Sequence, residues 1–221
     1  MKELLIMEKQ EVYNKYVGYI SANKSLCQKQ LSQLVKEFIN GGIITFFYFS
    51  DTLTAHAAVA YAFSDGRDSA GNFTYRSLQL PLGATLDKRD SKTEPASGYY
   101  LDLGAKPFFG FGATDDGARL TLDARAYKAL GAKGGAVLAG RLQGGAILGA
   151  SALGTPRTDL FYSGGGGTVR GQAYQSLGIS VLDGATWVDT GGTAFLAASV
   201  EARMKVSANI GVVGFVDAGA V

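Results

Sequence analysis

One arginine stands in the most glycine-rich stretch of the sequence, and its side chain is the clearest candidate for a specific chemical role. The stretch at 161–178 reads FYSGGGGTVRGQAYQSLG, so Arg170 closely follows four consecutive glycines, Gly164, Gly165, Gly166 and Gly167. A guanidinium is a planar fork of donors that carboxylates bind through charge-assisted hydrogen bonds, which lysine does not reproduce. Glycine allows positive φ and a close approach where a Cβ would collide. The stretch therefore favours a flexible loop that carries Arg170 to an acidic partner. The alternative is a solvated arginine on a surface loop.

The other reactive residue types form no recognisable catalytic or metal-binding set. Cys27 is the only cysteine and His56 the only histidine, so the usual zinc ligand sets cannot be assembled. Ser163 and Ser199 lack the motif context that a serine nucleophile working with His56 requires. GGGGTVRG lacks the lysine and the following Ser/Thr of a phosphate-binding loop. We therefore expect no enzyme activity, no metal and no cofactor.

Composition excludes two further classes of protein. The net charge is +2 over 221 residues, with 18% charged residues, so the basic surface of a nucleic-acid-binding protein is missing. No uninterrupted apolar run approaches the roughly 18 residues that a membrane-spanning helix needs. The start, MKELLIMEKQ, has only four consecutive apolar residues, too few for a secretory signal. We expect no nucleic-acid partner, no helical membrane span and no export signal in the chain as written.

Residues 1–40 differ in composition from the rest of the chain. They contain one glycine, no proline and ten charged residues, which leaves 30 of the 31 glycines for 41–221. Apolar residues recur there at a spacing of three to four, which predicts one or two amphipathic helices that end at Gly41-Gly42. We expect a helical segment over 1–41. Periodicity alone does not identify what this segment packs against or binds.

After Gly41 the apolar period changes to two, which is typical of β-strands with two different faces. In ARLTLDARAYK at 118–128, alanine and leucine alternate with charged and polar residues, and the same alternation extends over thirteen residues at 194–206. We expect about eight strands, at 42–50, 53–63, 76–87, 99–109, 118–128, 136–148, 194–206 and 209–220. The alternation places Glu201 and Asp217 on the polar faces of the last two strands.

The predicted strands are long, which favours a transmembrane β-barrel. Globular strands usually have five or six residues, whereas a tilted strand needs roughly 9 to 11 to cross a bilayer. We expect short turns at 64–72 and 130–134, and one long glycine-rich connection at 149–192, in the pattern of outer-membrane barrels. A soluble antiparallel sandwich is the alternative, because its strands also alternate with one face buried. The small apolar residues and the charged polar faces favour the barrel.

Three segments of this part of the chain resemble one family. GGGGTVRGQAYQSLG at 164–178 resembles the conserved-loop signature of the outer-membrane assembly and two-partner secretion superfamily, also called surface-antigen or D15-type barrels. FVDAG at 215–219 is similar to its second signature, on a strand that follows. ATLDKRDSKTEPASGYYLDL at 84–103 resembles a family hairpin. The resemblance covers about 52–221 and is closest to the translocation and assembly module branch, TamA-like proteins.

The resemblance implies an all-β fold in which the long loop folds back into the lumen of a sixteen-stranded transmembrane barrel. Arg170 matches the conserved arginine, held there by acidic residues at the positions of Glu201 and Asp217. The residues that match the two signatures, and that we expect at the loop contacts, are Val169, Arg170, Gly171, Glu201, Phe215, Asp217 and Gly219.

The resemblance also implies a bacterial outer-membrane protein that inserts or secretes β-rich clients, such as autotransporters, by templating their strands on an exposed edge. Membrane lipid, an unfolded client and a partner reaching across the periplasm are the implied partners. We further expect residues 42–221 to be a partial barrel domain, about half of the family barrel, preceded by the segment 1–41. A passive outer-membrane barrel, a fragment or fusion of a family member, and a soluble sheet protein are the alternatives.

Overall fold

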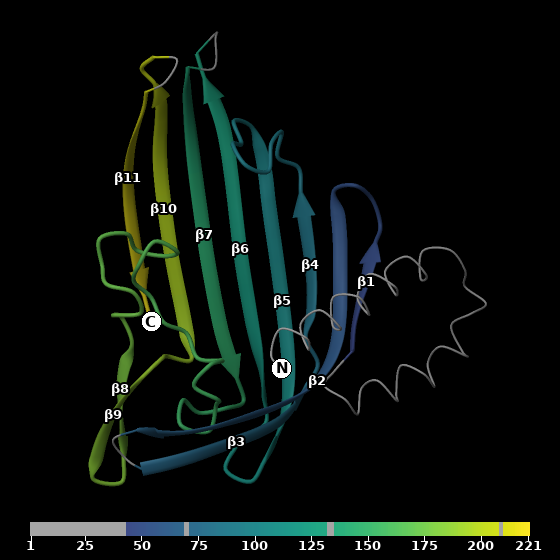
Figure 1. Ribbon diagram of the computed structural model, residues 1–221, viewed down its shortest axis with the longest axis vertical. Coiled ribbons are helices and arrows are strands. Elements are labelled where there is room, and N and C mark those ends of the chain that lie inside the picture. The colour runs from purple at the N-terminus through teal and green to yellow at the C-terminus, as the bar shows by residue number, and fades with distance from the viewer. Residues whose placement is uncertain (1–42, 69–70, 132–134, 208–209) are drawn as a thin grey trace, which may run out of the picture.

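The chain forms one large antiparallel sheet and a small hairpin, as the computed structural model in Figure 1 shows. The structure describes residues 43–68, 71–131, 135–207 and 210–221. The large sheet has the order β1-β2-β3-β5-β6-β7-β10-β11, and β4 pairs with β2 and β5. Its strands are β1 (Ile43–Tyr48), β2 (Leu53–Asp68), β3 (Gly71–Gln79), β4 (Leu82–Asp87), β5 (Gly98–Phe111), β6 (Gly117–Leu130), β7 (Ala136–Leu148), β10 (Ala194–Lys205) and β11 (Gly211–Ala220). Two further strands, β8 (Ile179–Asp183) and β9 (Thr186–Thr190), form the separate hairpin.

Strands β3 and β4 behave as one strand that is interrupted at Leu80 and Pro81. Proline has no N–H to contribute to a ladder. The neighbouring strands nevertheless stay bonded across the interruption, because the Leu80 N–H donates to the Pro107 carbonyl at 2.9 Å and the Ala58 N–H donates to the Pro81 carbonyl at 2.8 Å. The described chain therefore crosses the large sheet eight times, in agreement with the expected number of about eight strands.

Most strand bounds follow the alternation in the sequence. The observed β6, β7 and β10 match the ranges predicted at 118–128, 136–148 and 194–206 to within two residues. The interpretation of 64–72 as a short turn is wrong, since β2 continues to Asp68 and β3 begins at Gly71. Phe73, Thr74 and Tyr75 are good strand formers and continue the ladder opposite the polar end of β2.

Helices play no part in the described fold. The predicted helical segment 1–41 lies outside the described residues. Among the residues that are described, no helix is long and apolar enough to cross a membrane.

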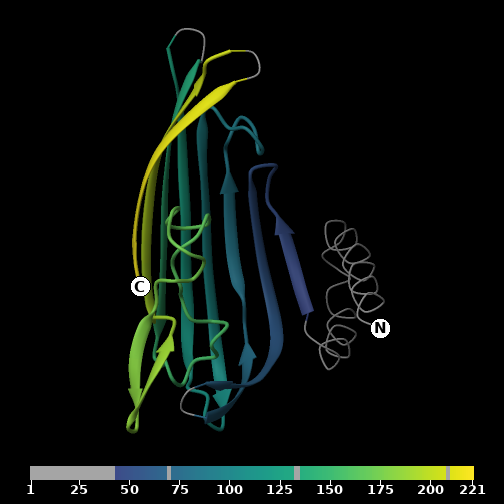
Figure 2. The ribbon, with the colours of Figure 1, turned by 60° about the vertical axis from the view of Figure 1, so that its left-hand side comes forward.

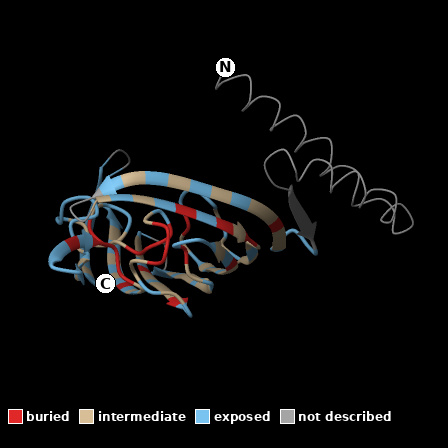
Figure 3. Cartoon of the chain, turned by 90° about the horizontal axis from the view of Figure 1, so that it is seen from below, coloured by how far each residue is buried: buried red, intermediate tan, exposed pale blue. Residues whose placement is uncertain are grey.

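The large sheet is bent into a trough, which Figure 2 shows from the side and Figure 3 from below. Successive residues of each strand point alternately into the trough and away from it. The outer face carries large apolar side chains that remain 38–75% exposed, among them Leu103, Leu120, Leu138, Leu142, Leu196, Val200 and Val216. The inner face carries polar and charged side chains, among them Asp102, Arg119, Asp123, Arg125 and Arg141. An apolar outer face opposite a polar interior is typical of a sheet embedded in lipid.

The connection between β7 and β10 enters the trough and covers part of its inner face (Figure 2). The cluster of buried apolar residues lies where the two meet, and joins Leu160 and Phe161 of the connection to Phe108 and Ile147 of the wall. We expected 149–192 to be a single long connection, but it contains the β8–β9 hairpin. These strands have five residues each, and one of their two faces is exposed, so the alternation over so short a range gives only a weak signal.

Candidate functional site: an arginine held against the inner wall

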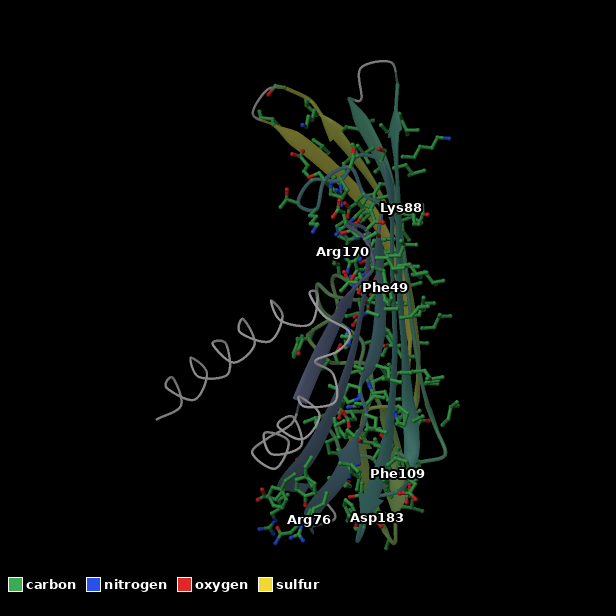
Figure 4. All side chains as sticks on the ribbon, turned by 90° about the vertical axis from the view of Figure 1, so that its right-hand side faces the viewer. Phe49, Arg76, Lys88, Phe109, Arg170 and Asp183 are labelled. Atoms are coloured by element: carbon green, nitrogen blue, oxygen red, sulfur yellow. The ribbon has the colours of Figure 1, made fainter. Side chains whose placement is uncertain are left out.

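The tip of the connection is a compact turn. An antiparallel bridge between Ser163 and Leu177 closes it. Inside the turn, the Gly164 N–H donates to Thr168 Oγ1 at 2.8 Å and the Gly165 N–H donates to the Val169 carbonyl at 3.1 Å. These bonds define a tip segment, residues 163–177, that presents Arg170 to the wall (Figure 4).

The loop glycines serve the tip in two different ways. Gly164, Gly165 and Gly171 have positive φ values of 104°, 90° and 89°, a region that favours glycine. We expected the four consecutive glycines to allow a close approach to the wall as well. At Gly166 and Gly167 this is not so, because an added Cβ would meet nothing within 4 Å.

The side chain of Arg170 binds three polar side chains of strands β10 and β11. Its Nε donates to Asp217 Oδ2 and its Nη2 to Asp217 Oδ1, both at 2.8 Å, so the pair is bidentate. Nη1 donates to Glu201 Oε2 at 2.6 Å, and Nη2 also donates to the Ser199 hydroxyl at 2.8 Å. The backbone N–H of Arg170 adds a further bond to Asp217 Oδ2 at 2.9 Å. We call Arg170, Ser199, Glu201 and Asp217 the tip cluster.

Strand register explains why these side chains meet. Ser199 lies directly opposite Asp217, and Glu201 lies directly opposite Phe215. Directly opposite residues of an antiparallel pair share a face, and so do residues two apart on one strand, so all four point into the trough. The guanidinium carbon of Arg170 lies 3.6 Å from the centre of the Phe215 ring, which adds a cation–π contact.

The two partners of the bidentate pair differ in how far they are buried. The Asp217 side chain is 2% exposed, whereas that of Arg170 is 28% exposed. A carboxylate so poorly solvated needs its hydrogen bonds satisfied by the protein. The side-chain hydrogen bonds to Asp217, and then the one to Glu201, raise the pKa of Arg170 above its ordinary value. Arg170 therefore remains a cation.

The remaining residues of the two signatures lie around the tip cluster. Val169 is packed against Gly219 of β11, where an added Cβ would come within 2.8 Å of Val169 Cγ2. The wall glycine thus permits the close approach that we had assigned to the loop glycines. Gly171 follows Arg170 with positive φ and with open space around it.

Sequence reasoning missed three wall residues that bind the tip. Ser199 bridges Arg170 and Asp217, since its hydroxyl donates to Asp217 Oδ1 at 2.7 Å. Its place two residues before Glu201, on the same face, was a signal that could have identified it. Arg141 Nη1 donates to the Gly167 carbonyl at 3.0 Å. The side-chain amide of Gln143, in the orientation that satisfies its neighbours, donates to the same carbonyl at 2.9 Å. Both face the trough from β7.

The hairpin between β4 and β5, which carries the third resembling segment, is held by Asp90. Its carboxylate accepts hydrogen bonds from the backbone N–H groups of Ser91, Ala96 and Ser97 at 2.9–3.1 Å. These hydrogen bonds lower the pKa of Asp90 below its ordinary value of 3.8, and the bond from the Ser97 N–H has the largest effect. Gly98 ends the hairpin with a φ of 97°, and an added Cβ would lie 2.1 Å from the Lys88 carbonyl oxygen.

The geometry of the site supports attachment of the loop. Across the described ranges of the chain, no three histidine, cysteine, aspartate or glutamate side chains come close enough together to hold a metal ion. The tip cluster consists of one cation, two carboxylates and one hydroxyl that satisfy one another. Its physical effect is to hold residues 163–177 against β10 and β11.

A trough of long antiparallel strands, with an apolar outer face and a loop fixed inside by an arginine, defines the wall of a transmembrane β-barrel. The profile of the Omp85 superfamily domain matches residues 18–221. The chain therefore belongs to the Omp85 superfamily.

Comparison with solved structures shows the same fold. The crystal structure of BamA from Haemophilus ducreyi lacking POTRA domains 1–3 matches with a TM-score of 0.68 and 15% sequence identity, over 81% of this chain and 40% of that chain. This chain thus spans less than half the length of the BamA structure that it matches. No curated protein matches the sequence significantly.

Proposed function

We propose that this chain provides the wall of a bacterial outer-membrane β-barrel that assists the insertion or secretion of β-rich client proteins by templating their strands. Membership of the Omp85 superfamily supports the general role. The observation that carries the proposal is the position of the tip cluster. Two of its members lie on β10 and one on β11, so the loop is attached to two neighbouring strands of the wall.

The physical link between the tip and strand templating is β11, the strand that carries Asp217. An edge strand presents unpaired N–H and C=O groups to which an incoming strand can add. Asp217 of β11 binds Arg170 on the inner side, so the state of the loop affects the strand to which the proposal adds the client strand. Strand addition involves no covalent step, and the proposal therefore requires no catalytic residue and no cofactor.

The finer assignments belong to the same proposal. The resemblance to TamA-like proteins supports autotransporters as clients and a partner that reaches across the periplasm. Outer-membrane lipid is the expected surrounding of the apolar outer face, because that face exposes leucine and valine side chains. The small net charge supports the absence of a nucleic-acid partner.

A passive outer-membrane barrel is the second candidate function. The observation that favours it is the loop inside the trough, since a loop fixed there narrows any pore that the barrel encloses. In this case the tip cluster only keeps the loop in the pore and limits permeability, and no client strand adds to β11.

Photocrosslinking in cells separates the two functions. A photoreactive amino acid at Val216 of β11, an outward position that is 75% exposed, is expected to crosslink to newly made outer-membrane proteins. The matched control is Leu142 in the middle of β7, which is outward and 42% exposed but lies between two paired strands. Client adducts at Val216 and none at Leu142 would support templating. Equal adducts at both positions, or none at Val216, would contradict it.

A further inference from the structure

A second charged cluster holds the other part of the loop, at a distance along the chain from the tip. Asp159 Oδ2 accepts a hydrogen bond from Gln79 Nε2 of β3 at 3.1 Å, and Asp159 Oδ1 forms an ion pair with Lys106 of β5. The Asp159 backbone carbonyl accepts a hydrogen bond from Arg119 Nε of β6 at 2.8 Å. We call these four residues the base cluster.

The base cluster and the tip cluster have opposite polarity. At the tip, the loop supplies the cation Arg170 and the wall supplies the carboxylates. At the base, the loop supplies the carboxylate of Asp159 and the wall supplies the cation of Lys106. The Asp159 side chain is 12% exposed, so its charge is largely removed from water and needs this partner.

The two clusters bind different parts of the wall. The base cluster uses β3, β5 and β6, whereas the tip cluster uses β10 and β11. A cavity of about 390 Å³ lies between loop and wall, lined by Tyr162 and Thr168 of the loop and by Thr121 and Gln143 of the wall. The base cluster and the tip cluster are therefore separate attachments of the loop. Near the start of the loop, Ser151 and Gly154 also bind Asp115 of the turn between β5 and β6.

Ring contacts and a further hydrogen bond reinforce the base of the loop. Phe161, two residues after Asp159, stacks on Phe195 with ring centroids 5.9 Å apart. The guanidinium carbon of Arg119 lies 4.3 Å from the centre of the Phe161 ring. Tyr75 of β3 donates from its hydroxyl to the Leu153 carbonyl at 2.8 Å. None of these contacts involves a residue of the tip cluster.

We propose that Asp159 is a positioning residue that attaches the base of the loop independently of Arg170, so that the loop stays in the trough when the tip cluster opens. The tip can then leave β11 without emptying the trough. This inference concerns how the loop is held, and it stands whether or not the chain assembles clients.

Cysteine labelling of the purified full chain in detergent micelles tests the proposal. In a Cys27→Ser background, Thr155→Cys reports on the base and Ser163→Cys reports on the tip, since both positions are at most 1% exposed. Asp159→Asn is expected to raise the rate of maleimide labelling at position 155 by about tenfold, as loss of a charge-assisted hydrogen bond implies, and to leave position 163 within about twofold. Arg170→Ala is expected to do the reverse.

Two controls complete the experiment. Asp102→Asn removes another inward carboxylate, which binds Thr85 of the neighbouring strand, and both reporters are expected to keep their rates. Lys106→Met removes the cation that faces Asp159 and is expected to expose position 155 alone, with no further increase when it is combined with Asp159→Asn. The proposal is overturned if Asp159→Asn and Lys106→Met each accelerate both reporters equally, or if neither changes the rate at position 155.

Discussion

Asp217 accepts four hydrogen bonds in the tip cluster, three from Arg170 and one from Ser199. Glu201 accepts one hydrogen bond from Arg170, and its other oxygen accepts one from Arg203 Nε. The side chains also differ in burial, with 2% exposed for Asp217 and 15% for Glu201. The two carboxylates that bind the same arginine are therefore far from equivalent.

Substitution of these acids is expected to show the difference. Asp217→Ala leaves Arg170 without its bidentate partner and is expected to lower the free energy of unfolding by about 3 kcal/mol, near the lower end for a broken buried pair because Arg170 stays partly exposed. Glu201→Gln keeps an acceptor and is expected to cost about 1 kcal/mol. Urea unfolding in lipid vesicles, followed by circular dichroism, measures both. Equal losses would contradict the asymmetry.

Arg170 and Asp217 are also expected to act as one unit. Arg170→Ala and Asp217→Ala should each lower the free energy of unfolding by similar amounts, and the double variant should lose little more than either, because both remove the same bonds. The same unfolding measurement completes the double-mutant cycle. Additive losses would mean that the two side chains do not depend on each other.

At the scale of the elements, β7 accommodates Phe161 of the loop because position 145 is a glycine. An added Cβ at Gly145, which faces the trough, would lie 2.2 Å from the Phe161 ring. That ring is 6% exposed and packed in the cluster of buried apolar residues, so it cannot move away freely. The base of the loop thus depends on a wall position that has no side chain.

Gly145→Ala is expected to destabilise the attachment of the loop by about 1–3 kcal/mol, as overpacking of a core does. Gly140→Ala is the matched control, because it lies on the same strand with nothing within 4 Å of the added Cβ. Limited proteolysis within 149–178 measures the effect, with faster cleavage expected for Gly145→Ala alone. The same cleavage rate in both variants would show that Phe161 adjusts without cost.

The sequence was informative where a regular period fixes the direction of side chains. Alternation predicted β6, β7 and β10 nearly to the residue, and it predicted inward faces for Glu201 and Asp217. Asp159 lies in an irregular part of the loop, where no period relates its position in the chain to the wall residues that it contacts. The extension of β2 past its apolar part depends on pairing with β3, which a single strand does not reveal.

At the scale of the whole molecule, the two faces of the trough are expected to respond oppositely to charge. Leu142→Lys places a cation on the apolar outer face in the middle of β7, where a charge facing lipid costs about 2–4 kcal/mol. Thr121→Lys places the same cation on the inner face, beside the cavity that also borders Asp123. Flotation with lipid vesicles should recover less Leu142→Lys protein and unchanged amounts of Thr121→Lys protein. Equal recovery would contradict a lipid-facing outer surface.

The loop joins two groups of strands that the sheet itself keeps apart. The hydrogen bonds and the ion pair of the base cluster attach the loop to β3, β5 and β6, and those of the tip cluster attach it to β10 and β11. A twisted sheet can flatten or curl through small rotations between neighbouring strands. A loop of fixed length that is attached at two places on the curved sheet limits how far the sheet can flatten. The radius of this wall is therefore set partly by a stretch of chain that contributes no strand to it.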